Sequence, residues 1–189
     1  MQPTVVDNFI SKQSAKDLHA FLRSKVQVNP MGLLSKQLYP FEQFINDPDA
    51  TFYFDVKLIV EAIQREFGFP EDQISINRVL YQVLREGEEL GYHTDAYGGV
   101  DGYGVIGYSA LLYLTDDYDG GEINFPDHNL KIKPKANSFI TFPSNEHYLH
   151  EVLKNSADRY SSTLWFNIEG TTYRGNINEI EGTSKTVEY

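Results

Sequence analysis

The segment Gly-Tyr-His-Thr-Asp at residues 91–95 follows an apolar run at 74–84 that has the composition of a β-strand. We expect residues 91–95 to lie on a hairpin arm that returns from this strand. His93 and Asp95 are two residues apart, and on an extended chain such residues project from the same face. An imidazole nitrogen and a carboxylate oxygen can therefore converge on one metal ion. Because a His-x-Asp pair is common by chance, the interpretation requires a third ligand.

The composition restricts where that ligand can come from. The chain has 189 residues, a length typical of one domain, and contains no cysteine. A metal would therefore be held by His, Asp or Glu, and disulfides and cysteine nucleophiles are excluded. The net charge of −11 argues against a nucleic-acid backbone or an anionic membrane as partner.

The sequence also bears on location. No apolar run approaches the roughly 18 residues that would span a bilayer. Residues 1–10 lack the basic and then apolar pattern of a secretory signal peptide. We therefore expect a cytoplasmic protein with no membrane partner. The pattern carries no information on oligomeric state.

Helical patterns occur in the first 70 residues. Residues 14–26 and about 55–67 place apolar side chains at i, i+3 and i+4. Ser14 is the expected cap of the first helix, and Gly68 ends the second. His19 lies off the apolar stripe and is expected to face solvent.

From residue 74 the pattern changes to short strands separated by Gly, Pro, Asn and Asp. The expected strands are 74–84, 105–115, 121–125, 129–133, 137–142, 147–153 and 160–168. This spacing predicts a sandwich, jelly roll or barrel. We expect one domain over 1–189, in which helices within 1–70 support the outer face of a sheet. Residues 74–168 would form the β core and 175–189 a polar tail.

A glycine-rich segment follows the His-x-Asp pair. Residues 98–104 contain four glycines, and the segment 96–104 fits either a lid over a substrate or a long hairpin connection. It is not a phosphate-binding loop, because no helix follows whose backbone amides could bind the phosphate.

Two histidines, His147 and His150, are candidates for the third ligand. They are three residues apart, so on a strand they would face opposite sides and only one could point inward. His150 lies between apolar residues, as expected of a ligand on a buried strand, whereas His147 follows Asn145 and Glu146. We therefore favour His150.

Arg159 begins a strand that is otherwise largely apolar. An arginine buried there needs a partner, because an unpaired buried charge is very costly. A ligand carboxylate held by the guanidinium fork would supply one. Alternatively, Arg159 reaches solvent at the rim of the sheet or pairs with the neighbouring Asp158.

Taken in order, these features resemble the Fe(II)- and 2-oxoglutarate-dependent dioxygenases, and among them the prolyl-4-hydroxylase-like group. The resemblance covers about residues 74–168. It rests on His93-x-Asp95, Ser-Ala-Leu-Leu-Tyr-Leu at 109–114, Asp-Gly-Gly-Glu-Ile-Asn-Phe-Pro at 119–126, Lys-Pro-Lys at 133–135, Ser-Phe-Ile-Thr-Phe-Pro-Ser at 138–144, His-Glu-Val at 150–152, Arg159-Tyr160 and Trp165.

The resemblance implies a double-stranded β-helix (jelly roll), a mainly β fold of the α+β class, with the N-terminal helices packed on its outer face. It implies three ligands of Fe(II): His93, Asp95 and His150. Arg159 would bind the distal C5 carboxylate of 2-oxoglutarate, with Tyr113 and Ser161 as further hydrogen-bonding groups. The Gly-Gly turn at 120–121 is expected to be structural, and Trp165 to line the core or pocket wall.

The chain also departs from the family pattern. Many prolyl hydroxylases have a tyrosine three residues before the glycine that matches Gly87, where this chain has Leu84. Tyr81 should face the other side of the strand, so the contact to the C1 end of the cosubstrate is left open. Asn137 stands where a glycine is usual.

The function implied is hydroxylation of a prolyl or other amino-acid side chain, in a peptide, a protein or a small amino-acid-like substrate. Fe(II), 2-oxoglutarate and O2 would be required, with ascorbate as reductant, and succinate and CO2 would be released. The alternative from another class is a cupin-like metal-binding jelly roll without oxygenase activity, which would not need Arg159 to face the interior. A third alternative is a β-sandwich interaction module with incidental histidines.

Overall fold

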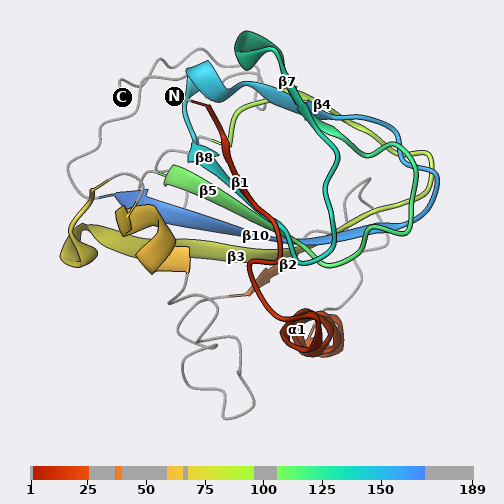
Figure 1. Cartoon of the computed structure of the whole chain (residues 1–189), viewed down its shortest axis with the longest axis horizontal. Helices are drawn as coiled ribbons and strands as arrows, with labels where there is room; N and C mark the ends of the chain where they lie inside the picture. Colours follow the sequence, from red (N-terminus) through yellow and green to blue (C-terminus); the bar gives the residue numbers. More distant parts are fainter. Residues whose placement is uncertain (1, 26–36, 40–58, 66–67, 96–105, 169–189) are drawn as a thin grey trace.

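The protein is built mainly from two antiparallel β-sheets, as the computed structural model in Figure 1 shows. The structure describes residues 2–25, 37–39, 59–65, 68–95 and 106–168. Within these residues the larger sheet has six strands, in the order β1 (Thr4–Val6), β8 (Phe139–Pro143), β5 (Ile106–Tyr113), β10 (Arg159–Ile168), β3 (Ile74–Leu84) and β2 (Gln37–Tyr39). The smaller sheet of the same described part has four, in the order β4 (Leu90–His93), β9 (His150–Val152), β6 (Ile123–Phe125) and β7 (Leu130–Ile132).

The central strands of the larger sheet are buried on both faces, which explains their long apolar runs. In β5, Leu111 and Tyr113 pack with Phe125 of the smaller sheet. The alternate residues Ala110 and Leu112 belong to a second apolar cluster on the outer face. The two sheets therefore enclose a shared core, which is the arrangement of a jelly roll. The predicted fold class is confirmed.

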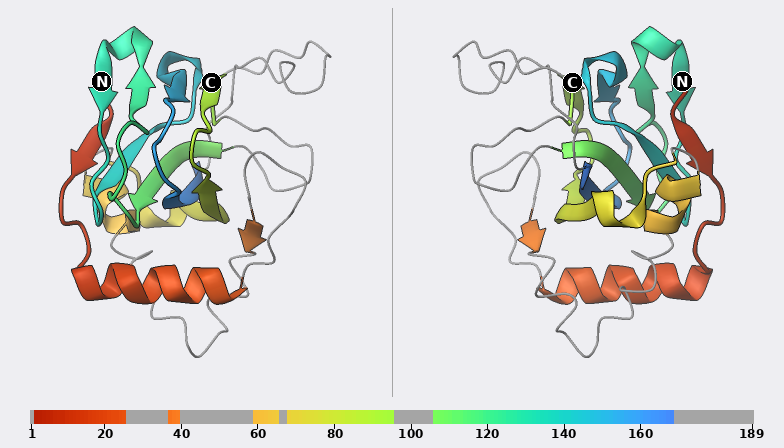
Figure 2. Two further views of the ribbon diagram at one scale, coloured as in Figure 1. Left: turned by 90° about the vertical axis from the view of Figure 1, so that its right-hand side faces the viewer. Right: turned by 90° about the vertical axis from the view of Figure 1, so that its left-hand side faces the viewer.

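Two helices cover the outer face of the larger sheet, as predicted. α1 (Lys12–Lys25) buries Leu18 there, and the helix seen at 59–65 buries Ile59 and Ile63 in the same cluster. Figure 2 shows α1 lying lengthwise beneath the sheets. The outward side chains of the larger sheet are thus shielded from water, and its inward side chains are left to form a site.

The ends of both helices can be compared with the prediction. The backbone amide of Ser14 donates to Oγ of Ser11 at 2.9 Å, so Ser11 is the cap and α1 begins at Lys12. The choice of Ser14 as the cap was wrong. Gly68 has φ +70°, and its amide donates to the carbonyl of Gln64 at 2.8 Å. This confirms Gly68 as the end of the second helix.

Two expectations about the strands were wrong. The strand expected at 147–153 begins only at His150, because Glu146–Tyr148 form a 3₁₀ helix. β4 is not a hairpin arm of β3, since it pairs with β9 in the other sheet. A strand of three or four residues has too little periodicity to reveal its partner, which depends on segments far apart in the sequence.

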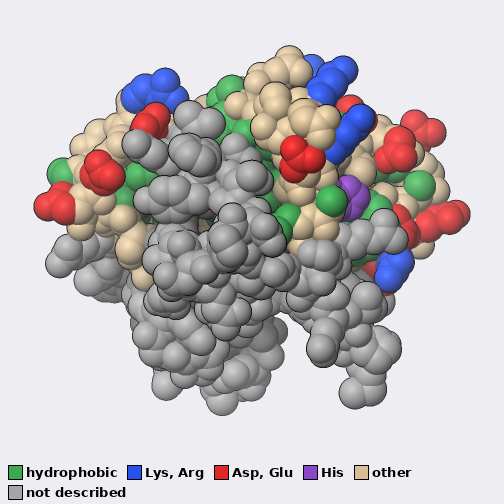
Figure 3. Space-filling model, turned by 90° about the horizontal axis from the view of Figure 1, so that it is seen from below, with side chains coloured by type: hydrophobic (Ala, Val, Ile, Leu, Met, Phe, Trp, Pro, Cys, Tyr) green, Lys and Arg blue, Asp and Glu red, His purple; other side chains and the backbone are tan. Residues whose placement is uncertain are grey.

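Some expectations concern residues that the structure does not describe: the helix start at 55, the glycine-rich segment 96–104 and the tail 175–189. Among the described residues, no helix is both long and apolar enough to cross a membrane. Acidic side chains lie at both ends of the face drawn in Figure 3, which agrees with the net charge of −11.

Candidate metal centre and adjoining pocket

Three potential metal ligands meet between the two sheets. His93 ends β4, Asp95 follows it, and His150 begins β9 directly opposite His93 in the strand register. One ligand atom from each of the three residues lies within 4.8 Å of the others. The distance from His93 Nε2 to Asp95 Oδ1 is 3.7 Å. The structure thus brings together the two histidines and one carboxylate that the sequence predicts.

Both imidazole rings are held in place by the backbone. Nδ1 of His93 lies 2.8 Å from the carbonyl oxygen of Gly91, and Nδ1 of His150 lies 2.9 Å from that of Tyr148. A carbonyl can only accept, so each Nδ1 carries the proton and each Nε2 keeps its lone pair. Such contacts orient histidine ligands in metal sites.

The charges at this cluster suit a cation. Burial and, to a smaller extent, the nearby His93 lower the pKa of His150 to about 4, so His150 is neutral at pH 7. Burial alone would raise the pKa of Asp95, but the two imidazoles, together with Ser109 and Trp165, hold it below its ordinary value. The cluster thus offers one carboxylate and two imidazole nitrogens, a donor set that fits Fe(II).

His147 takes no part in the cluster. Its side chain is exposed on the 3₁₀ helix before β9, whereas His150 is 2% exposed. Of the two candidate histidines, the structure places His150 in the cluster, and the reason given for that preference was partly wrong. The two do not alternate on one strand, because the chain turns between them.

Arg159 lies at the other end of the same pocket. It is 3% exposed, and its Nη2 donates to the hydroxyl of Tyr113 at 3.0 Å, while its Nε has no hydrogen-bond partner in the described part of the chain. Asp158 does not neutralise it, because that carboxylate pairs with Arg85 at 2.9 Å. The expected alternative of a local ion pair with Asp158 therefore does not hold. A buried cation that has no acidic partner within the described residues indicates an anionic ligand.

Tyr113 and Ser161 lie beside Arg159. They are opposite each other in the register of β5 and β10, and both are 0% exposed. Burial raises the pKa of Tyr113, so its phenol stays protonated at neutral pH. Among the described residues Oγ of Ser161 has no hydrogen-bond partner. An unpaired hydroxyl in so buried a position is costly unless a ligand forms a hydrogen bond with it.

The turn at Gly120 and Gly121 leaves room for the side chain of Arg159. A Cβ on Gly121 would lie 2.8 Å from the ring of Tyr118 and 3.3 Å from Cδ of Arg159. Both glycines have positive φ, +72° and +67°. The expectation that this turn is structural is confirmed, and the turn also shapes the pocket.

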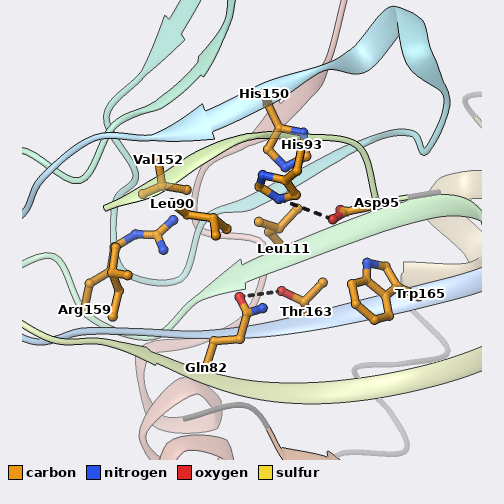
Figure 4. A pocket seen from close by; sticks show the side chains of 11 residues that line it. Gln82, Leu90, His93, Asp95, Leu111, His150, Val152, Arg159, Thr163 and Trp165 are labelled. Atoms are coloured by element: carbon orange, nitrogen blue, oxygen red, sulfur yellow. Dashed lines mark hydrogen bonds and ion pairs between the residues drawn. The ribbon is translucent and has the colours of Figure 1, made fainter. Parts of the chain in front are cut away.

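Figure 4 shows the pocket that runs between Arg159 and the metal-ligand cluster. Its walls come from both sheets: Gln82, Leu84, Leu90, His93, Asp95, Leu111, His150, Val152, Arg159, Thr163 and Trp165. The indole nitrogen of Trp165 points toward Asp95 but forms no hydrogen bond of ordinary geometry. Trp165 is thus a pocket-wall residue, as expected.

Sequence reasoning missed Gln82 and Thr163. Both have a signal in the period-2 alternation of their strands, since Thr163 is four residues after Arg159 and Gln82 is two before Leu84. Tyr81 lies on the opposite face, where its hydroxyl is 2.9 Å from Nε2 of His19. His19 is therefore partly buried rather than solvent-facing.

Comparison with known proteins agrees with this geometry. Residues 78–167 match the model of the 2OG-Fe(II) oxygenase superfamily. This segment, just under half of the chain, is therefore similar to that superfamily. The matched segment contains the three metal-ligand candidates, Arg159 and most of the pocket strands β3 and β10.

Relatives are found among prolyl hydroxylases. The chain is 40% identical over 70 residues to prolyl 3-hydroxylase 2 of Mus musculus, a match that covers 33% of this chain and 10% of that protein. The chain therefore spans only about a tenth of that relative's length.

Solved structures show the same fold. A viral collagen prolyl hydroxylase from Paramecium Bursaria Chlorella virus-1, in complex with 2OG, superimposes with a TM-score of 0.70 at 17% identity, over 89% of this chain and 96% of that one. A prolyl hydroxylase from Trichoplax adhaerens, in complex with a hypoxia inducible factor peptide fragment, gives 0.64 at 21% identity over 88% and 84%.

Proposed function

We propose that this protein is an Fe(II)- and 2-oxoglutarate-dependent oxygenase that hydroxylates a prolyl or other amino-acid side chain. His93, Asp95 and His150 would hold the iron. Arg159, with Tyr113 beside it, would bind the distal carboxylate of 2-oxoglutarate. Fe(II), 2-oxoglutarate and O2 bound together supply hydroxylation of a C–H bond coupled to oxidative decarboxylation of the cosubstrate to succinate and CO2.

The observation that carries the proposal is that Arg159 is buried, has no acidic partner in the part of the chain that the structure describes, and shares one pocket with the metal-ligand cluster. A metal-binding jelly roll of the cupin type needs the histidines and the carboxylate but has no use for a buried guanidinium. The cost of burying this charge is offset if a dicarboxylate binds between the arginine and the metal. Nε of Arg159 and the hydroxyl of Ser161, which have no partner among the described residues, also point to a missing hydrogen-bond acceptor there.

Each group in the pocket has a defined task in this proposal. Arg159 neutralises and orients the distal carboxylate, and the protonated hydroxyl of Tyr113 helps to hold it. The leucines and valine of the pocket wall, Leu84, Leu90, Leu111 and Val152, exclude water from the space between the two ends. The two imidazoles and the carboxylate would leave the remaining metal positions free for ligands.

The substrate proposal draws on the relatives. A prolyl 3-hydroxylase, a collagen prolyl hydroxylase and a prolyl hydroxylase bound to a peptide are all similar to this chain. We propose a peptide or protein as the substrate of this chain, with a prolyl residue as the first candidate. A free amino acid of similar shape is the second.

The test is release of succinate from 2-oxoglutarate with Fe(II), ascorbate and O2, with and without proline-rich peptides. We expect slow turnover without substrate and faster turnover with it. Arg159→Ala should reduce turnover at least a hundredfold at low 2-oxoglutarate, because about 1.5–3 kcal/mol per charged hydrogen bond is lost at a bidentate contact. Arg85→Ala is the matched control, since Arg85 pairs with Asp158 at the surface.

If the native protein neither binds 2-oxoglutarate nor forms succinate, the oxygenase proposal is wrong. Metal binding in that case would support the cupin-like alternative. Equal activity of Arg159→Ala and native protein would refute the role of Arg159 alone.

A further inference from the structure

Gln82 is a polar side chain in the middle of an otherwise apolar stretch of the pocket wall. It lies on β3 between Arg159 on one side and the metal-ligand cluster on the other (Figure 4). In the strand register it is opposite Ser161 of β10. Leu84, two residues further along β3, also lines the pocket but offers no hydrogen-bonding group.

The amide of Gln82 is held in one orientation. The hydroxyl of Thr163 donates to its Oε1 at 3.0 Å, and Thr163 is itself only 2% exposed. The acceptor end of the amide is thus satisfied. Its Nε2, which carries two N–H donors, has no hydrogen-bond partner among the described residues and can donate to a ligand. Figure 4 shows this amide on the floor of the pocket.

β10 places Arg159 and Thr163 at different positions along the pocket. Thr163 is four residues beyond Arg159, which corresponds to about 13 Å of strand. The guanidinium of Arg159 reaches the hydroxyl of Tyr113, whose Cα is opposite that of Ser161 further along β10, and this shortens that separation. A ligand anchored by Arg159 would extend past Gln82 toward His93 and the other metal ligands.

We propose that Gln82 donates a hydrogen bond from Nε2 to the metal-proximal C1 carboxylate of 2-oxoglutarate, and that Thr163 positions the amide for it. This inference rests on the proposed function. It assigns to Gln82 the contact with the C1 carboxylate, which the apolar side chain of Leu84 cannot make.

The hydrogen-bond donors that line the pocket support this assignment. Among the described residues that line the pocket, the neutral N–H donors outside the histidines are Gln82 and Trp165. The indole of Trp165 faces Asp95, whereas Gln82 faces the space between the two ends. A carboxylate near the metal but away from Arg159 therefore has Gln82 as its protein donor.

The experiment measures binding rather than turnover. Mn(II) replaces Fe(II) so that no reaction occurs, and ligand binding is followed by the fluorescence of Trp165, the single tryptophan of the chain. Two ligands are compared: 2-oxoglutarate, which has both carboxylates, and 2-oxopentanoate, which lacks the distal one. Gln82→Met keeps the length of the side chain but removes the amide.

We expect Gln82→Met to weaken the binding of both ligands by about ten- to a hundredfold, the range for a lost hydrogen bond to a charged group. Thr163→Val should weaken both by about two- to tenfold, because Gln82 is no longer oriented. Arg159→Ala should weaken the binding of 2-oxoglutarate and leave the binding of 2-oxopentanoate unchanged. Asn124→Leu is the control, since its amide bonds Glu151 and does not line the pocket. Mn(II) affinity and thermal stability should be unchanged in Gln82→Met.

Two results would overturn the assignment. Unchanged binding of both ligands by Gln82→Met would show that Gln82 makes no contact with the cosubstrate. Weakened binding of 2-oxoglutarate alone would place Gln82 at the distal carboxylate instead. Failure of the native protein to bind 2-oxoglutarate would refute the proposed function together with this inference, so the two failures are distinguishable.

Discussion

At the scale of single residues, two neighbours show how burial decides a role. Asp158 and Arg159 are adjacent in the sequence and opposite in charge, yet they do not pair. Asp158 binds Arg85 at the surface, and Arg159 points inward to Tyr113. On a strand, successive side chains face opposite sides, so an ion pair between them is geometrically unfavourable. This leaves Arg159 available for a ligand.

Burial of His150 predicts a pH-dependent stability of the metal-free protein. Its pKa is about 4 in the folded protein, below the value of about 6.5 in an unfolded chain. Between these values the unfolded state binds a proton that the folded state does not. The free energy of unfolding therefore falls as the pH decreases from 6.5 toward 4, by about 2 kcal/mol at pH 5.

The measurement is urea denaturation at pH 7.5 and at pH 5 in the presence of a chelator. His150→Asn should lose less stability over this interval than the native protein does. An equal loss in both proteins would contradict the assignment to His150. The lowered pKa of Asp95 adds a further loss only below pH 4.

At the scale of elements, β10 carries the greatest part of the site. Its alternation places Arg159, Ser161, Thr163 and Trp165 on the pocket side and Leu164 and Phe166 in the outer core. The sequence predicts this strand almost to its ends, because both faces are buried. The short strands β1 and β2 escape prediction, since three residues provide no periodicity.

The Gly120–Gly121 turn before β6 yields a second stability prediction. Gly120→Ala would place a Cβ 2.0 Å from the carbonyl oxygen of Lys154, in addition to the strain of φ +72°. Gly87 is the matched control, because it has φ +78° with nothing within 4 Å. We expect Gly87→Ala to cost about 1 kcal/mol of unfolding free energy and Gly120→Ala at least about 3 kcal/mol.

Chemical denaturation of both variants provides the comparison. If Gly120→Ala costs no more than Gly87→Ala, the close approach to Lys154 does not determine the turn. The cost of Gly87→Ala measures backbone strain alone, and the additional cost of Gly120→Ala measures the steric contact with Lys154.

At the scale of the whole molecule, closure of the jelly roll assembles the site. His93 and His150 are on neighbouring strands of the smaller sheet, and Arg159 is on the larger one. A metal ion would link the chain after β4 to the start of β9. The pocket exists only because the two sheets face each other.

Metal binding should therefore stabilise the folded protein. We expect Mn(II) or anaerobic Fe(II) at a hundred times the dissociation constant to add about 2.7 kcal/mol, visible as a higher thermal midpoint that a chelator reverses. His150→Ala should abolish the shift. His147→Ala should retain it, because His147 lies outside the cluster. The reverse pattern would refute the ligand assignment.

The sequence by itself determined the local features of this protein. The two-residue spacing of His93 and Asp95, the two-sided apolar pattern of β5 and β10 and the glycine turn at 120–121 all follow from rules that act over a few residues. The strand alternation also specified which side of β10 Arg159 shares with Ser161 and Trp165.

Only the tertiary structure decided the rest. The separation of β3 and β4 into different sheets, the turn that exposes His147 and the bond between Thr163 and Gln82 join segments far apart in the chain. Such contacts depend on which strands pair and in what register. That choice is made by the packing of the whole core, and no short stretch of sequence contains it.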